Sequence, residues 1–131
     1  MPDPAPQRPP ITIVLADDHT VIRSGLRLLL DAVEDFQVVA EAGTIRGVFQ
    51  QVRAEWPMVL VLDLNMPGGS SIEAIPRLVK MAPKMSVVVL TMDDSPAFVR
   101  AAFDAGAKGY VLKEAAGTEL VDAIRVAASP G

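Results

Sequence analysis

Short apolar runs alternate along the chain with segments in which apolar residues recur at helical spacing. The short runs, rich in β-branched residues, predict strands at residues 11–16, 36–40, 58–62, 86–90 and 109–112. The helical spacing predicts helices from Val21 to Val33, over 44–54 and 71–81, from Ser95 to about Ala105, and from Gly117 onward. Regular alternation of strand and helix is typical of a parallel sheet covered by helices on both faces.

Several residues mark the expected ends of these helices. Asp18 or Thr20 is the expected N-cap of the first helix, and Ser95 is the expected cap of the fourth. Gly106 is expected to end the fourth helix. Pro76 falls inside the third helix and is expected either to kink it or to mark a late first turn.

The order of the predicted strands follows from the rules for parallel sheets. Crossover connections between parallel strands are right-handed, and no internal repeat is present. The simplest arrangement is an α/β, doubly wound, flavodoxin-like sheet of five parallel strands in the order 2-1-3-4-5, flanked by five helices.

Polar residues stand where four of these strands end. Asp17 and Asp18 follow the first strand, Asp63 the third, Thr91 the fourth and Lys113 the fifth. Ligands bind open α/β sheets at the carboxyl ends of the strands. We therefore expect these five side chains to meet in one crevice between the first and third strands.

The expected crevice suits a cation and a phosphoryl group. Carboxylates a few ångström apart repel one another unless a cation shares the site. Mg²⁺ fits Asp18, Asp63 and a turn carbonyl near Asn65, because it prefers a few carboxylates together with waters and phosphate. With the ammonium of Lys113 and the hydroxyl of Thr91 nearby, this set suits transfer of a phosphoryl group to Asp63.

Composition narrows the class of protein. The 131 residues, half of them apolar and none of them cysteine, fit one domain without disulfides, and no apolar run is long enough to span a membrane. Residues 1–10, MPDPAPQRPP, are expected to form a disordered proline-rich leader with no signal-peptide core, so a cytoplasmic location is the default. A net charge of −4 without a basic cluster argues against DNA binding by this segment itself.

An ordered set of segments adds a family resemblance. VLADDHTVIRSGLRLLL, VLVLDLNMPGG, VVVLTMDD, GAKGYVLKE and ELVDAIRVAA follow one another between residues 11 and 128. This set resembles the receiver domain of bacterial two-component response regulators, and most closely the NarL/FixJ (LuxR-type) subfamily. The resemblance implies a CheY-like fold for residues 11–128.

The resemblance also implies roles for the acidic residues. Asp63 would accept a phosphoryl group from the phosphohistidine of a sensor histidine kinase or from a small phosphodonor. Asp18, Asp63 and the backbone carbonyl of Asn65 would bind Mg²⁺ directly, and Asp17 would act mostly through water.

The remaining site residues are implied to form a switch. Lys113 would pair with the phosphoryl oxygens, Thr91 would move to hydrogen-bond the same group, and Tyr110 would change rotamer to fill the space that Thr91 leaves.

Two residues depart from the general receiver pattern. Glu114 follows Lys113 where many receivers have a cis-proline, and an acidic residue there favours the NarL/FixJ subfamily. Ser71 takes the place of a usual glycine, which leaves the geometry of residues 66–72 open.

The resemblance supports one function over three rivals. The expected protein is a transcriptional regulator that continues from a linker beginning at 129–131 into a helix-turn-helix domain, with phosphorylation controlling dimerisation, DNA binding, or both. A stand-alone receiver that binds a partner protein is the alternative. A hydrolase with Asp63 as nucleophile is disfavoured because Asn65 stands where its second acid would be, so we expect no enzyme, and an atypical receiver is disfavoured because the full residue set is present. His19 is read as a solvent-facing residue at a helix start.

Overall fold

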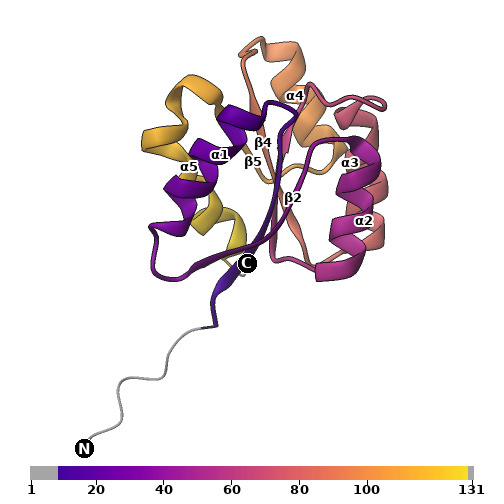
Figure 1. Cartoon of the computed structure of the whole chain (residues 1–131). Coiled ribbons are helices and arrows are strands. Elements are labelled where there is room, and N and C mark those ends of the chain that lie inside the picture. The colour runs from indigo at the N-terminus through magenta and orange to yellow at the C-terminus, as the bar shows by residue number, and fades with distance from the viewer. Residues whose placement is uncertain (1–8, 130–131) are drawn as a thin grey trace, which may run out of the picture.

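The computed structural model describes residues 9–129. Strands and helices alternate along it (Figure 1): β1(Ile11–Ala16), α1(Thr20–Asp31), β2(Phe36–Ala42), α2(Ile45–Glu55), β3(Val59–Asp63), α3(Ser71–Met81), β4(Ser86–Thr91), α4(Pro96–Ala105), β5(Gly109–Leu112), the 3₁₀ helix η1(Lys113–Ala115) and α5(Ala116–Ala128). The expected leader at 1–10 and the expected linker start at 129–131 fall mostly outside the described residues.

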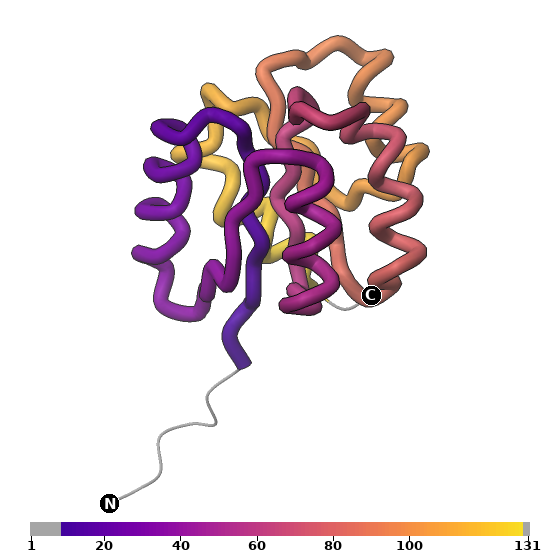
Figure 2. Tube along the Cα trace, turned by 45° about the vertical axis from the view of Figure 1, so that its right-hand side comes forward, coloured from indigo at the N-terminus to yellow at the C-terminus, as the bar shows by residue number. Residues whose placement is uncertain are grey.

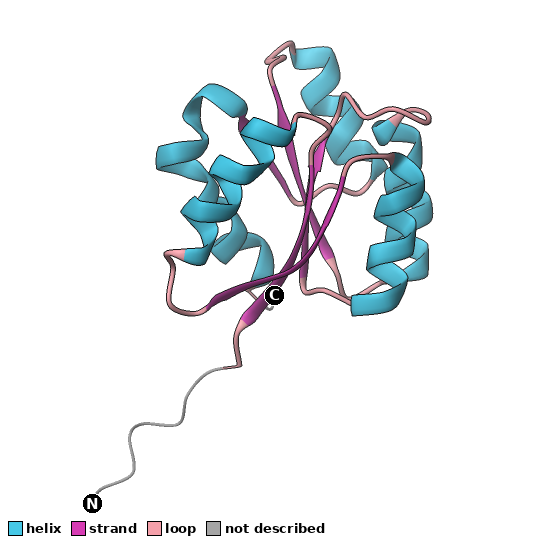
Figure 3. Ribbon diagram, in the orientation of Figure 1, coloured by secondary structure: helices cyan, strands magenta, loops and turns pink. Residues whose placement is uncertain are grey.

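The strands form one parallel sheet in the order β2-β1-β3-β4-β5, as predicted. Helices lie on both sides of it (Figure 3). One layer contains α1 and α5, and the other contains α2, α3 and α4. The prediction of a doubly wound, flavodoxin-like sheet with five α-helices is therefore confirmed.

The central strand β3 explains why its sequence shows no polar alternation. Its five residues are all buried. Leu60 and Leu62 pack with the apolar faces of α2, α3 and α4, whereas Val59 and Val61 pack with α1 and α5. A strand covered on both faces needs apolar side chains at every position. Only its last residue, Asp63, is charged, and the loop that leads to α3 begins directly after it.

Two predicted helix starts are wrong. The N-cap of α1 is His19, whose side chain makes no capping bond, and Thr20 is the first helical residue. Asp17 instead accepts the His19 N–H at 2.8 Å, so the carboxylate belongs to the turn after β1. The last helix begins at Ala116 after the short 3₁₀ turn, which leaves Gly117 inside it.

The other predicted ends agree with the structure or shift by one or two residues. Pro76 lies inside α3, so it does not mark a first turn. Gly106 ends α4 with a φ of 122°, in the region that favours glycine. Ser95 caps α4 by position, although its hydroxyl makes no capping bond.

The carboxyl and amino ends of the strands form two opposite edges of the sheet with different neighbours. The Cα trace in Figure 2 places the loops after β1, β3 and β4 at one edge, and β1 begins at the opposite edge. The end of α5 lies at that opposite edge, because Ser86 at the start of β4 donates a hydrogen bond to the Ala127 carbonyl at 2.7 Å. No helix within residues 9–129 has the length and apolar character needed to cross a membrane.

Candidate functional site

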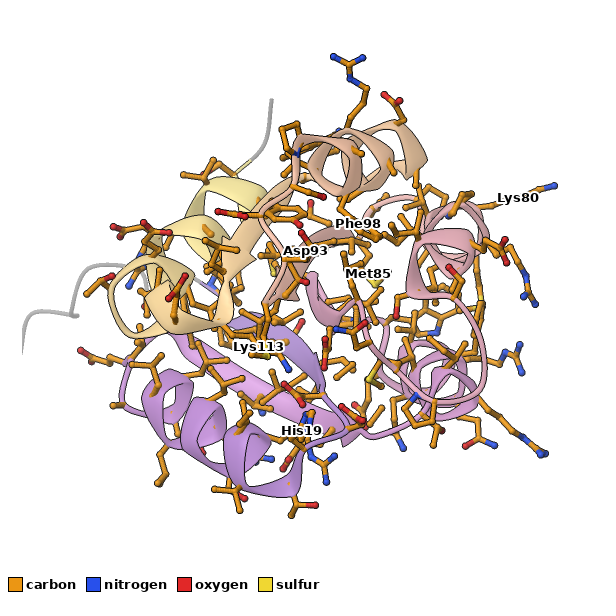
Figure 4. All side chains as sticks on the ribbon, turned by 90° about the horizontal axis from the view of Figure 1, so that it is seen from above. His19, Lys80, Met85, Asp93, Phe98 and Lys113 are labelled. Atoms are coloured by element: carbon orange, nitrogen blue, oxygen red, sulfur yellow. The ribbon has the colours of Figure 1, made fainter. Side chains whose placement is uncertain are left out.

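The carboxyl edge of the sheet brings two buried carboxylates and one lysine together. Asp17 follows β1 directly, Asp63 ends β3, and both side chains have 0% exposed surface. Lys113 follows β5 and is 9% exposed. Figure 4 looks down on this edge, with the side chains of Lys113 and His19 around its centre. The convergence expected from the strand order is therefore present for these residues.

Lys113 bridges the two carboxylates. Its Nζ donates a hydrogen bond to Asp63 Oδ2 at 2.9 Å and lies 3.1 Å from Asp17 Oδ2. Burial lowers the pKa of Lys113, but the hydrogen bond to Asp63 and the negative charges of Asp63 and Asp17 outweigh it, so this pKa lies above its usual value. Lys113 is therefore a permanent cation at neutral pH.

The surroundings of Asp63 have opposing effects on its pKa. Burial raises its pKa and is the dominant influence, and the charge of Asp17 acts in the same direction. The Asn65 N–H, which donates to Asp63 Oδ1 at 3.0 Å, and Lys113 both lower it. The carboxylate is thus held in place through both oxygens, at a free-energy cost that a further cation would reduce.

One carboxylate oxygen of Asp17 lacks a hydrogen bond. Asp17 Oδ1 accepts the His19 N–H, whereas Oδ2 accepts no hydrogen bond from the described residues and has only the ion pair with Lys113. Buried carboxylate oxygens are ordinarily satisfied by donors or cations. Because its one partner among the described residues is the Lys113 ammonium, Asp17 Oδ2 can accept a further donor, such as a water molecule bound to a cation.

Asp18 and His19 complete an acidic cluster. One ligand atom from each of Asp17, Asp18, His19 and Asp63 lies within 4.8 Å of the others. Asp18 is 31% exposed, and its Oδ1 lies 3.1 Å from His19 Nδ1. The sequence interpretation of His19 as solvent-facing is correct in exposure, at 58%, but it missed the contact with the carboxylates. The only sequence signal for this contact is that His19 directly follows the acidic pair.

This cluster has the chemistry of a hard-cation site. Carboxylate oxygens that are partly open to water suit Mg²⁺, which keeps several waters when bound. Imidazole is a less suitable ligand for Mg²⁺, so the three carboxylates are the relevant donors. The Asn65 N–H donates a hydrogen bond to Asp63 Oδ1. Binding of Mg²⁺ by the Asn65 carbonyl stays a prediction.

Thr91 and Tyr110 both contact the turn after β4. Thr91 is 1% exposed and follows Leu90, the residue that pairs with Asp63 across β3 and β4. Its Oγ1 accepts the Asp93 N–H at 3.1 Å. Tyr110 donates its hydroxyl proton to the Asp93 carbonyl, and its ring centroid lies 6.5 Å from that of Phe103. The two predicted switch residues are thus joined through Asp93.

Ser71 fixes the loop after Asp63, which the sequence left open. Its hydroxyl donates to the Asp63 backbone carbonyl at 2.7 Å, and its side chain is 1% exposed. Gly68 and Gly69, with φ values of 99° and 140°, make the turn before it. A serine in place of glycine therefore adds a link between the end of β3 and the start of α3.

Comparison with known proteins identifies the family. Residues 13–125 match the model of the response regulator receiver domain. The oxygen regulatory protein NreC of Staphylococcus epidermidis is 39% identical over 114 residues, which cover 86% of this chain and 52% of NreC.

Two solved structures are similar over most of the chain. A LuxR-family two-component response regulator from Aurantimonas sp. SI85-9A1 has a TM-score of 0.86 at 35% identity, covering 91% of this chain and 85% of that one. The receiver domain of the putative response regulator NarL from Mycobacterium tuberculosis has a TM-score of 0.86 at 30% identity, covering 92% and 98%.

The extent of these matches defines what they establish. The chain spans about half the length of NreC, so the matches concern a receiver domain rather than a whole regulator. The match to the family model includes Asp17, Asp18, Asp63, Thr91 and Lys113. The chain belongs to the response regulator receiver domain family, and its relatives are NarL-type regulators of the LuxR family.

Proposed function

We propose that Asp63 is the phosphoacceptor of this receiver domain and takes its phosphoryl group from the phosphohistidine of a sensor histidine kinase or from a small phosphodonor. The observation that supports this role most strongly is the placement of a buried Asp63 between Lys113 and the incompletely satisfied Asp17 at the carboxyl edge of the sheet. This arrangement supplies one nucleophilic carboxylate and a fixed positive charge beside it.

The bonds exchanged in this step are simple. An ionised Asp63 oxygen attacks phosphorus and a phosphorus–oxygen bond forms. With phosphohistidine as donor the phosphorus–nitrogen bond breaks and imidazole leaves, whereas with acetyl phosphate a phosphorus–oxygen bond breaks and acetate leaves. Lys113 lowers the pKa of Asp63 and so opposes burial, which favours the protonated form that cannot attack. Its ammonium, which donates to Asp63 Oδ2, would pair with phosphoryl oxygens once Asp63 is modified.

The proposed cofactor is Mg²⁺. Asp18, Asp63 and the Asn65 carbonyl would hold it, with Asp17 acting through water. When bound, the ion neutralises negative charge on the phosphoryl group and on the carboxylates. The acidic cluster and the Asp17 oxygen without a hydrogen bond support this assignment.

Thr91 and Tyr110 are proposed to report the modification. The hydroxyl of Thr91 would leave the Asp93 N–H and hydrogen-bond the phosphoryl group, and Tyr110 would change rotamer with it. Thr91 accepts the Asp93 N–H and Tyr110 donates to the Asp93 carbonyl. A shift of Asp93 when the Thr91 contact breaks would therefore also disturb the Tyr110 contact, which supports a coupled movement.

The output is proposed to be transcription regulation in the cytoplasm by a longer protein. In it, phosphorylation would control dimerisation, a DNA-binding domain after residues 129–131, or both, and the receiver would not be an enzyme with a separate substrate. A stand-alone receiver that binds a partner protein is the second candidate. The family of LuxR-type relatives and the partial coverage of NreC favour the first.

Intact-mass spectrometry after incubation with acetyl phosphate tests the acceptor. We expect a Mg²⁺-dependent gain of one phosphoryl group that is absent in Asp63→Asn. Asp104→Asn, an exposed acid on α4, is the matched control and should keep the gain. A gain that persists in Asp63→Asn would show that another residue is modified and would overturn the assignment.

A further inference from the structure

An apolar groove lies at the edge of the sheet opposite Asp63. It has a volume of about 330 Å³ and lies between the end of α2 and the loop that leads into β4. Its lining residues are Trp56, Pro57, Ala82, Pro83, Lys84 and Met85. Pro57, Ala82 and Met85 are buried and form the floor, and the exposed residues form the rim. In Figure 1, α2 ends at the same edge of the sheet at which β1 begins.

Trp56 is the unusual member of this rim. It ends α2 with φ 46° and ψ 59°, in the left-handed region. Within residues 9–129 it is the only residue other than glycine with positive φ. Glycine or asparagine commonly takes this position, because a side chain there is strained. The side chain is nevertheless 60% exposed, so core packing does not account for a tryptophan at this place.

We propose that the groove is the docking site of this chain's own proline-rich segment, residues 1–8. That segment reads MPDPAPQR and has prolines at positions 2, 4 and 6. Proline-rich segments adopt the polyproline II helix and bind grooves lined by aromatic side chains. A groove rimmed by an exposed indole and by Pro83 matches that class of ligand.

The chain enters β1 close enough to the groove to reach it. The Met58 N–H donates to the Thr12 carbonyl at 3.0 Å, and the Ser86 N–H donates to the Met58 carbonyl at 2.9 Å. Trp56 and Pro57 precede Met58, and Met85 precedes Ser86. The groove therefore lies about two strand spacings, roughly 10 Å, from β1. Eight residues of polyproline II extend over roughly 25 Å, which leaves length to spare.

Tethering favours this occupant. Docking within one chain benefits from effective concentration, which is in the millimolar range for short flexible tethers. An intrinsic affinity of about 0.1 mM would then keep the segment docked roughly 90% of the time.

The chain permits a clean distance test, because it contains one tryptophan and no cysteine. A bimane label on Ala5→Cys is quenched by an indole only at close range. With the segment docked, we expect W56F to raise the bimane emission roughly twofold or more, since phenylalanine preserves an aromatic rim without quenching. A label on Ser24→Cys, exposed on α1, is the matched control and should not respond to W56F.

Replacing Pro2, Pro4 and Pro6 by serine in the labelled chain separates docking from mere proximity. We expect this triple variant to lose the quenching as completely as W56F does. Deletion of residues 2–8 from the unlabelled chain should in turn make Trp56 more accessible to acrylamide. Equal bimane emission with and without the indole would overturn the proposal. So would quenching that survives the serine variant, or an acrylamide accessibility that the deletion leaves unchanged, because the groove would then be bare or covered by another segment or a second copy.

Discussion

Replacement of Lys113 by methionine tests whether this lysine compensates the buried carboxylates. Among the described residues it is the only lysine or arginine that pairs with the side chain of Asp17 or Asp63, both fully buried. Removing one partner of a buried ion pair costs about 3–5 kcal/mol. The 9% exposure of Lys113 and the ability of Asp63 to take up a proton limit the loss to about 3 kcal/mol, or about 10 °C in Tm for a domain of this size.

Urea unfolding followed by far-UV circular dichroism at neutral pH in the presence of EDTA measures this loss. Lys80→Met, on the exposed face of α3, is the control and should change stability by less than about 0.5 kcal/mol. In an Asp63→Asn background the effect of Lys113→Met should fall by about half, because one of two carboxylates is gone. A loss below about 1 kcal/mol, or one that Asp63→Asn leaves unchanged, would refute the reasoning.

Three further changes test other parts of the site and fold. Ser71→Ala removes the hydrogen bond to the buried Asp63 carbonyl and should cost about 1–2 kcal/mol in urea unfolding, an expectation that a change below about 0.3 kcal/mol would contradict. Because burial raises the pKa of Asp63 above 3.8, the folded state binds more protons than the unfolded state. Stability should therefore fall as pH rises from about 4 through the folded-state pKa, and Asp63→Asn should flatten that fall in thermal scans taken at a series of pH values; identical slopes would contradict this. Thr44→Ala removes the hydroxyl that accepts the Gly47 N–H at the start of α2 and should cost about 1 kcal/mol by chemical denaturation, with Thr44→Ser as the variant that retains the cap.

The fold could be predicted because periodicity and strand rules act over whole segments. Alternation of short apolar runs with helical spacing requires only that each element bury its apolar face, and the strand order then places Asp17, Asp63 and Lys113 at one edge. These predictions tolerate errors of one or two residues at each element end.

The individual contacts were beyond the sequence because they depend on loop conformation and side-chain rotamers, which hydrophobic periodicity does not determine. The hydroxyl of Ser71 finds its acceptor on a strand eight residues earlier in the chain. His19 caps α1 by position alone, without a side-chain capping bond, and its own N–H donates to the Asp17 side chain. The left-handed conformation of Trp56 contradicts local preference, and no sequence rule would assign it to a tryptophan.

The order of the strands divides the site into two halves with different freedom to move. Asp17 and Asp63 are carried by β1 and β3, each hydrogen-bonded to strands on both sides, whereas Lys113 follows β5, a four-residue strand paired only with β4. Displacing an outer strand breaks one ladder of hydrogen bonds instead of two, so it opens at a lower free energy. The two carboxylates are therefore held rigidly by inner strands. Conformational change should instead move Lys113 together with β5, the outer strand at that side of the sheet.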